Sequence, residues 1–315
     1  MASKTLTLQV RPRGKPLKKL GEETTIASND SGAELYKRIA AQCGVSVHRT
    51  RITKGSDGQL VPNSTEYTIE RTGLRDRSTI YVKDLGPQIA WRTVFIVEYL
   101  GPLLIHPLIY YTRSYLPFSP RPSTPPSTLQ TLTLALTTLH FLKRELETLF
   151  VHRFSSSTMP LRNVFKNSAH YWLLAGLLIA YSVYVPGSSP AATSYDALRP
   201  LARARVALGL AFYLAGELGN AATHLELRSL RARGSAARGI PRGWGFGAVT
   251  CPNYAFETLA WIGMWAVSGS WAVAAFTAVA ASTMAVWARK KERRYRREFG
   301  EGYAPKRWVM VPGVV

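Results

Sequence analysis

Six apolar stretches constrain this chain more than any other feature of its sequence. They are residues 89–111, 129–142, 169–185, 201–222, 249–267 and 271–287. The first is long enough to cross a bilayer whose hydrocarbon core is about 30 Å thick, and the second is the weakest. None is uniformly apolar, which leaves room for a helical interior that holds polar ligands. The pattern predicts a mainly α membrane protein with about six transmembrane helices.

The basic segments between these stretches predict how the helices cross the membrane. If residues 1–85 lie in the cytosol, the segments on the same side are 143–166, 224–247 and 289 onward. Their basic side chains are Lys143, Arg144, Arg153, Arg162, Lys166, Arg228, Arg231, Arg233, Arg238, Arg242 and those of RKKERRYRREF. The opposite segments hold few, as expected from the excess of Lys and Arg in cytoplasmic loops. We therefore expect cytosolic N- and C-termini.

Composition argues against several other classes of protein. The formal net charge of +21 would suit a nucleic-acid-binding protein. The basic residues, however, lie beside apolar stretches and not on a soluble module with stacking aromatics, so we expect no nucleic-acid partner. Cys43 and Cys251 lack the spacing of a disulfide framework or a metal site. The start, MASKTLTLQVRPRGK, has no apolar core, so we expect no secretory signal peptide.

The first 85 residues have a different pattern. Residues 4–10 alternate with the strand period, and the turn RPRGKP leads to an expected second strand at 17–20. Ser31 and its neighbours supply capping side chains for a helix AELYKRIAAQCGV. Strands RTRITK and STIYVKDLG follow. This order resembles the ubiquitin-like β-grasp fold. We expect a small ubiquitin-like α+β domain over 1–85, on the cytosolic side, and a transmembrane domain over 86–315.

Polar side chains inside or at the ends of the apolar stretches are candidates for function, because each is costly in lipid. They are Lys143 and Glu147 in HFLKRELETLFVHRF, Glu217, Asn220 and His224 in GELGNAATHLELRSLR, and Asn253, Tyr254 and Glu257 in TCPNYAFETLAW. Simpler interpretations stay open. Lys143 and Glu147 could form an ion pair on a helix surface, Tyr254 could be an interfacial anchor, and the arginines could serve topology alone.

The same segments resemble a known family. ETLFVHRFSSSTMPLRNVFKNSAHYW, LGNAATHLELRSLR, TCPNYAFETLAWIGMW and the tail WARKKERRYRREFGEGYAPKRW are similar to the very-long-chain trans-2-enoyl-CoA reductases of the steroid 5α-reductase family, with a fungal-like character. The resemblance covers nearly the whole chain. It implies NADPH-dependent reduction of a trans-2-enoyl-CoA to the saturated acyl-CoA, the last step of microsomal fatty-acid elongation. It also implies an endoplasmic reticulum location, with acyl-CoA and membrane lipid as partners.

The resemblance also assigns residues. It implies that Tyr254 and Lys143 are catalytic. The cofactor positions that it implies are Asn220, Arg228, Arg231, Asn253, Glu257 and Tyr295. Two positions depart from the family pattern, because His224 stands where relatives have an acid and Glu292 stands where relatives commonly have a histidine.

Elementary chemistry gives Tyr254 a role. Hydride addition to the β-carbon of an enoyl thioester places negative charge on the carbonyl oxygen and the α-carbon, where a fixed donor is most useful. A phenol with an ordinary pKa of about 10 is such a donor at neutral pH. Tyr254 would hydrogen-bond the enolate or deliver the α-proton. Lys143 would act on the tyrosine or hold a phosphate, and Arg228 and Arg231 suit bidentate phosphate contacts.

Three alternatives remain at this stage. A steroid reductase of the same family would share the site. A membrane methyltransferase would use S-adenosylmethionine and would not need the Tyr254 hydroxyl. A non-catalytic adaptor would present the ubiquitin-like domain to cytosolic partners, and Tyr254→Phe would then be silent. Docking of the N-terminal domain to other elongation enzymes is a further hypothesis.

Overall fold

A computed structural model describes residues 4–116, 125–154, 157–185, 189–230, 239–306 and 308–314. The chain divides into two compact units. The first consists of Met1–Trp91 with Ser157–Asn163, and the second of Arg92–Ser156 with Val164–Val315.

The first unit is built on a four-stranded sheet with the order β2-β1-β4-β3. Its strands and helices are β1 (Thr5–Pro12), β2 (Glu23–Ala27), α1 (Gly32–Gln42), η1 (Val47–Arg49), β3 (Thr50–Lys54), η2 (Glu70–Thr72), β4 (Thr79–Asp84) and β5 (Gln88–Ala90), with β6 (Thr158–Pro160). β1 pairs antiparallel with β2 and parallel with β4, and β3 pairs antiparallel with β4. β5 and β6 form a separate antiparallel pair.

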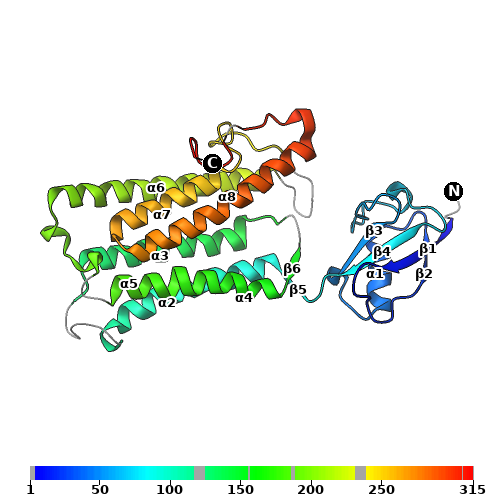
Figure 1. The fold of residues 1–315 in the computed structure, drawn as a ribbon, viewed down its shortest axis with the longest axis horizontal. Helices are drawn as coiled ribbons and strands as arrows, with labels where there is room; N and C mark the ends of the chain where they lie inside the picture. Colours follow the sequence, from blue (N-terminus) through cyan, green and yellow to red (C-terminus); the bar gives the residue numbers. More distant parts are fainter. Residues whose placement is uncertain are drawn as a thin grey trace. The chain divides into compact units, whose positions relative to one another are not determined.

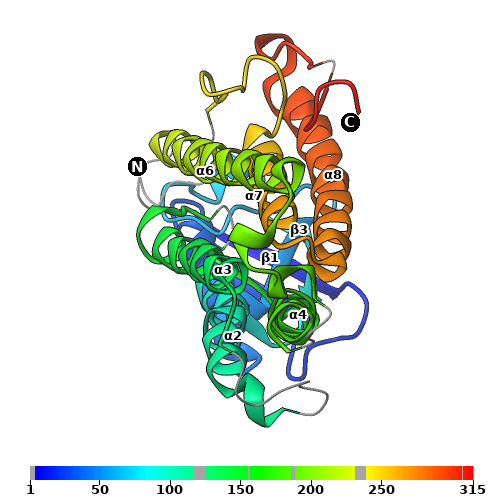
Figure 2. The ribbon, with the colours of Figure 1, turned by 90° about the vertical axis from the view of Figure 1, so that its left-hand side faces the viewer.

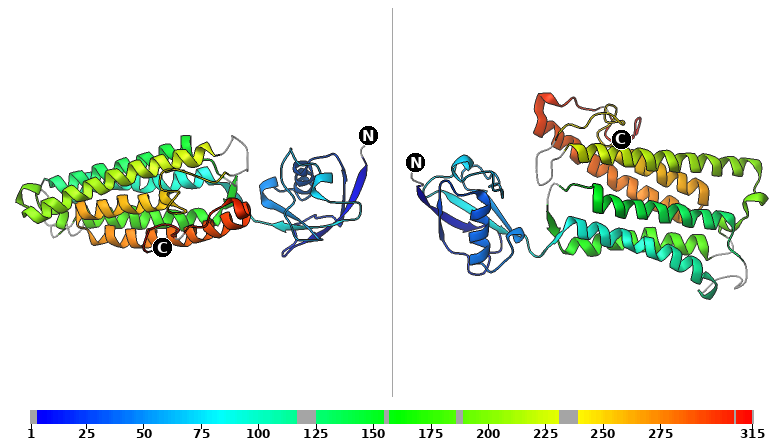
Figure 3. Two further views of the ribbon diagram at one scale, coloured as in Figure 1. Left: turned by 90° about the horizontal axis from the view of Figure 1, so that it is seen from above. Right: turned by 180° about the vertical axis from the view of Figure 1, so that it is seen from behind.

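The helix α1 covers one face of this sheet (Figure 3). Ser31 caps the helix by accepting a hydrogen bond from the Glu34 backbone N–H. Leu35 and Ile39, on its buried face, pack with strand residues such as Leu8 and Ile52 in one apolar core. The apolar residues of the helix, which recur about every 3.6 positions, thus pack against those of the strands, which recur every second position.

One sequence-based expectation for this unit is wrong. Residues 17–20 form no strand, and the second strand is Glu23–Ala27. Leu17 is nonetheless buried in the core of the unit. Its apolar side chain packs into the core although its backbone pairs with no strand. The apolar residues at 17–20 therefore led to a prediction of the strand too early in the sequence.

The second unit is a helical assembly. Its helices are α2 (Trp91–Thr112), α3 (Thr128–Leu146), α4 (Arg162–Ala169), α5 (Ile179–Tyr184), α6 (Pro200–Ser229), α7 (Pro252–Ser268) and α8 (Trp271–Phe299). Two π-helical segments are η4 (Glu147–Val151) and η5 (His170–Leu178), and short 3₁₀ turns are η3 (Arg113–Tyr115), η6 (Pro190–Ala192), η7 (Tyr195–Ala197) and η8 (Gly300–Gly302). The long helices lie side by side (Figure 1), and the end-on view shows α7 next to both α6 and α8 (Figure 2).

Glycines bring α6 and α7 into close contact. A Cβ on Gly216 would lie 2.5 Å from the Ala260 nitrogen, and one on Gly263 would lie 2.5 Å from the Gly209 carbonyl oxygen. Only residues without a side chain allow backbones to approach this closely. Small residues at such contacts are typical of helix packing in membranes, where apolar association alone gives no driving force.

Each of the six apolar stretches coincides with a helix, and α4, η5 and α5 follow one another without interruption. Among the described residues, two helices are long and apolar enough to cross a membrane, Trp91–Tyr115 and Trp271–Gly302. The others are shorter or contain polar groups; Glu217 and Asn220, for example, lower the hydropathy of α6. The structure therefore shows a mainly helical protein with two candidate spans.

Candidate active site

Three basic side chains on one helix face three carboxylates inside the second unit. His140, Lys143 and Arg144 all belong to α3. The carboxylates are those of Glu147 at the start of η4, Glu217 on α6 and Glu257 on α7. Buried charges persist when they are paired and hydrogen-bonded. Equal numbers of each sign keep this interior close to neutral when all six groups are ionised.

Two residues from each of α3, α6 and α7 form a closed ring, here called the six-residue ring. Lys143 Nζ donates to Glu217 Oε2 (2.9 Å) and to Asn220 Oδ1 (2.7 Å). Asn220 Nδ2 donates to the Asn253 carbonyl oxygen at 2.9 Å. The sequence spacings of three or four residues place each pair on one helix face.

His140 completes the six-residue ring. Its Nδ1 lies 2.6 Å from Glu217 Oε1, and its Nε2 lies 3.4 Å from Glu257 Oε1. Glu257 is one helical turn after Asn253 on α7, and its contact with His140 returns the series to α3, where it began. The ring therefore cross-links three helices through five buried or half-buried side chains and the backbone carbonyl of Asn253.

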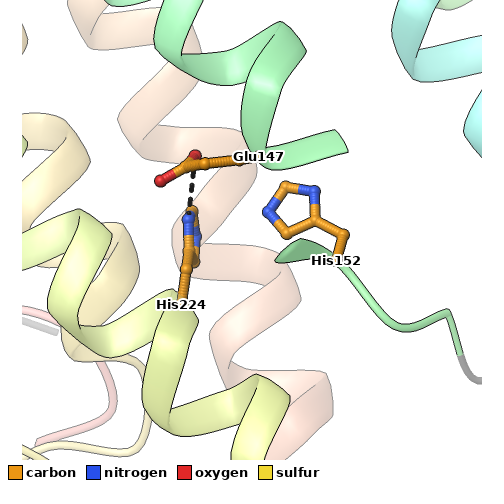
Figure 4. A group of neighbouring side chains, drawn as sticks. All are labelled: Glu147, His152 and His224. Carbon is orange, nitrogen blue, oxygen red and sulfur yellow. Dashed lines mark ion pairs between the residues drawn. The ribbon is translucent and has the colours of Figure 1, made fainter. Parts of the chain in front are cut away.

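Figure 4 shows a second cluster, which lies beside the six-residue ring because Lys143 Nζ is 3.6 Å from Glu147 Oε1. Glu147 Oε2 lies 3.0 Å from His224 Nδ1, and potential ligand atoms of Glu147, His152 and His224 all lie within 4.8 Å of one another. Such a set could hold a metal ion. However, Arg144 Nη1 lies 2.8 Å from Glu147 Oε2 and 3.4 Å from His224 Nδ1. The guanidinium already supplies the positive charge there, which disfavours a divalent cation.

Tyr254 lies at the start of α7, one residue after Asn253. Its hydroxyl forms no hydrogen bond with any residue in the part of the chain that the structure describes, and its ring lies 6.5 Å from that of Trp287 on α8. The positive charge that acts most strongly on the phenol is that of Lys291 on α8. Lys143 is instead bound to Glu217 and Asn220. The hydroxyl is thus a free donor on the residue that follows Asn253 of the six-residue ring.

The C-terminal tail fixes the segment that carries Tyr254. The buried Glu292 carboxylate accepts hydrogen bonds from Thr250, from the Tyr303 hydroxyl (2.6 Å) and from Arg296 Nε (2.9 Å). Burial and the Glu292 carboxylate raise the pKa of Tyr303, so its hydroxyl stays protonated and donates. Cys251 N–H donates to the Val309 carbonyl. The tail therefore holds the segment before α7 against α8.

The site contains buried acceptors that no described residue uses and that fit the amide of a nicotinamide. Asn253 Oδ1 and Glu147 Oε1 are buried acceptors without a hydrogen bond to any described residue. A buried acceptor left without a donor is costly, so each suits the amide N–H groups of a ligand. The Arg228 side chain, on the last turn of α6, has no ion pair with a described residue and suits a phosphate.

Comparison with known proteins finds relatives that match most of the chain. Residues 157–315 match the family described as 3-oxo-5-alpha-steroid 4-dehydrogenase. The very-long-chain enoyl-CoA reductase of Dictyostelium discoideum is 38% identical over 94% of this chain and 95% of its own length. A Schizosaccharomyces pombe protein named as an enoyl reductase is 40% identical over 98% of this chain and 99% of its own length. The trans-2,3-enoyl-CoA reductase-like protein of Mus musculus is 31% identical over 78% of this chain and 67% of its own.

The chain belongs to the very-long-chain enoyl-CoA reductases of the steroid 5α-reductase family. The structure brings together four of the site residues that the sequence indicates in this reductase, namely Lys143, Asn220, Asn253 and Glu257. Tyr254 adjoins them on α7. Tyr295 lies farther along α8, with Lys291 Nζ 5.6 Å from its ring centroid. Arg231 lies outside the described residues.

Sequence reasoning missed part of this polar cluster. His140 was not singled out, and neither was Tyr99 on α2, whose buried hydroxyl accepts a hydrogen bond from Arg144 Nη2 at 2.8 Å. Glu98 and Tyr99 were within reach of sequence analysis, because polar groups in an apolar stretch are themselves functional candidates. His140 gave a weaker signal, since its two carboxylate partners come from α6 and α7.

Proposed function

We propose that this chain reduces very-long-chain trans-2-enoyl-CoA to saturated acyl-CoA with NADPH, with Tyr254 as the donor to the developing enolate. The observation that carries the proposal is the Tyr254 hydroxyl, which is held at the start of α7 without a hydrogen-bond partner among the described residues. Very-long-chain enoyl-CoA reduction is the activity that the names of two relatives of this chain state.

The residues of the site divide the chemistry between them. The reduced nicotinamide, when bound, supplies the hydride for the β-carbon. Negative charge then develops on the thioester oxygen and the α-carbon, and the Tyr254 hydroxyl donates a hydrogen bond to it or delivers the α-proton. The charge of Lys291 stabilises the phenolate that proton delivery would leave. Lys143 acts indirectly, because its ammonium group orients Glu217 and Asn220.

NADPH is proposed as the donor on the basis of the polar groups that remain unused. Asn253 Oδ1 suits the nicotinamide amide, and Arg228 suits a phosphate. Exposed basic residues of α8 line a shallow hollow that would favour the further negative charge of a 2′-phosphate. They are Lys290, Arg293, Arg294, Arg296 and Arg297.

The membrane arrangement completes the proposal. Six helical segments would cross the endoplasmic reticulum membrane, with both termini in the cytosol where NADPH and acyl-CoA are found. The order β2-β1-β4-β3, with its central parallel pair and the helix α1, supports a ubiquitin-like domain over 1–85 and a reductase domain over 86–315. The charged side chains of α3, α6 and α7 face one another inside the second unit, which is where membrane helices place such groups. This arrangement supports a lipid surrounding for the unit. Other elongation enzymes are proposed partners of the N-terminal domain.

The test is NADPH oxidation by the purified protein in detergent, with a long-chain trans-2-enoyl-CoA as substrate. Tyr254→Phe removes one hydroxyl and should lower kcat by about 100- to 1,000-fold, the usual loss for one oxyanion donor. Tyr111→Phe is the matched control, since Tyr111 is 73% exposed on α2, and should retain full activity. Equal rates for both variants would contradict the role of Tyr254. If the protein oxidised NADPH with a 3-oxo-4-ene steroid and not with the enoyl-CoA, the substrate assignment would be wrong.

A further inference from the structure

Two buried histidines of the second unit have opposite surroundings. His140 is 2% exposed and His106 is fully buried. His106 Nε2 lies 2.9 Å from the Ala175 carbonyl oxygen, and its Nδ1 lies 2.9 Å from the Tyr184 hydroxyl. A carbonyl requires a donor and a hydroxyl can donate, so the neutral ring satisfies both contacts. His140 has a carboxylate oxygen at each nitrogen instead.

The neutral ring does not fit the surroundings of His140. A neutral imidazole has one N–H and one lone pair. With Nδ1–H donated to Glu217 at 2.6 Å, the lone pair of Nε2 would face Glu257 Oε1 at 3.4 Å, oxygen against nitrogen with no proton between them. In a buried site such a contact is repulsive and leaves an acceptor unsatisfied. A proton on both nitrogens converts both contacts into charge-assisted pairs.

The remaining groups around His140 agree with a positive charge. Glu217 from α6 and Glu257 from α7 face its nitrogens, and Lys143 and Arg144 of α3 lie beyond these carboxylates. The other neighbours are aromatic: the ring centroids of Phe141 and Trp261 lie 4.9 Å and 5.0 Å from that of His140. Without the His140 proton, Glu257 would have no ion pair with a described residue, and its half-buried negative charge would lie unbalanced.

We propose that His140 is a permanently protonated positioning residue, which closes the six-residue ring and thereby holds Glu257, Asn253 and Asn220 in the arrangement that binds the cofactor. The proposal rests on the proposed function for the identity of that cofactor, NADPH, and not for the charge of the histidine. Its physical basis is that one imidazolium joins α3 to both α6 and α7. Loss of the charge releases Glu257 from α3, while Lys143 still holds Glu217.

The charge is tested without activity. The protein contains six histidines, so a sample labelled with ¹⁵N-histidine gives few ring signals. At pH 7, one histidine should show two protonated ring nitrogens, and this pair should vanish in His140→Gln. If that variant does not fold, Glu257→Gln serves instead, because loss of the carboxylate at Nε2 should convert the same signals to a neutral ring. A neutral His140 in the wild type would overturn the proposal.

The positioning role is tested by NADPH binding, followed through cofactor fluorescence. His140→Gln should raise the Kd for NADPH by about 10- to 100-fold, as expected when displaced groups no longer align with a ligand. His106→Gln, a buried histidine away from the carboxylates, should change it less than about 2-fold. An unchanged Kd in folded His140→Gln would refute the role. Failure of wild type to oxidise NADPH with enoyl-CoA would instead refute the proposed reaction, and the nitrogen spectrum would still decide the charge.

Discussion

The first unit buries apolar side chains and exposes polar ones, whereas the second unit has an apolar core but also buries charged side chains and exposes many apolar ones. The first has a core of leucines, isoleucines and valines, and its buried polar residues among those described are Thr50 and Thr53. The second buries Glu147 and His140 while Leu104 and Leu108, on α2, are 57% and 61% exposed. This difference indicates two solvents: water around the first unit, and hydrocarbon around much of the second.

The contrast also explains where chemistry can take place. In water, a charged pair on the surface contributes little, because solvent screens it. In the interior of the helical unit, charges interact more strongly, and each needs a partner. The polar cluster of the second unit is built from such pairs, so substitutions there should change the stability of this unit. Matched substitutions in the two units can break or sharpen this comparison.

The largest difference is expected for loss of a carboxylate. Glu217→Leu leaves His140 and Lys143 without their shared partner and should destabilise the second unit by about 3–5 kcal/mol. Glu34→Leu on α1 removes exposed pairs with Lys37 and Arg38 and should cost less than about 1 kcal/mol. Hydrogen exchange of peptides from each unit, measured along a denaturant series, gives both values. Similar losses in the two units would contradict the comparison.

A somewhat smaller difference is expected when lysine replaces an exposed leucine. Leu104→Lys places a charge on the apolar surface of α2 and should weaken membrane insertion by about 2.5–3.5 kcal/mol. Leu60→Lys makes the same change in the first unit, at 51% exposure, and should stay within about 0.5 kcal/mol. Carbonate extraction of membranes from expressing cells reports insertion. Full retention of Leu104→Lys in the membrane would show that lipid does not surround this face.

The smallest effect concerns a surface ion pair of the first unit. Arg49 binds Asp84 through two hydrogen bonds of 2.7 Å, and this contact lowers the pKa of Asp84. A carboxylate whose pKa is lower in the folded state stabilises the fold above its ordinary pKa, which is about 4. The advantage over Asp84→Asn should therefore be present at pH 6 and disappear as the pH falls below about 4.

The stability difference between wild type and Asp84→Asn can be measured by the rate of peptic cleavage within residues 4–84, at each pH from about 2 to 5. The ratio of the two rates should approach one at the acid end. A ratio that stays constant throughout the range would mean that the ion pair does not contribute.

Much of the fold was accessible from the sequence because it depends on local periodicity. The alternation in residues 4–10 and the capping residue Ser31 predicted β1 and α1, and the apolar stretches predicted the long helices. The misplaced strand at 17–20 shows the limit of this reasoning, since Leu17 is buried by packing and not by pairing. The number of helices that cross the membrane is harder to predict, because the hydropathy of a helix does not show which of its polar side chains are buried inside the protein. Asn220 on α6 is one such buried polar residue.

The sequence by itself determined the family, the chemistry available, and the helices on which Lys143, Asn220, Asn253, Tyr254 and Glu257 lie. Motif spacing within one helix fixes which side chains share a face, and a sequence displays that spacing directly. Only the tertiary structure decided that Lys143 binds Glu217 and Asn220, and that Lys291 is the cation that acts most strongly on Tyr254. It also placed His140 between two carboxylates. Electrostatic interactions depend on distance in space, and residues about 75 positions apart along the chain meet only when the helices pack.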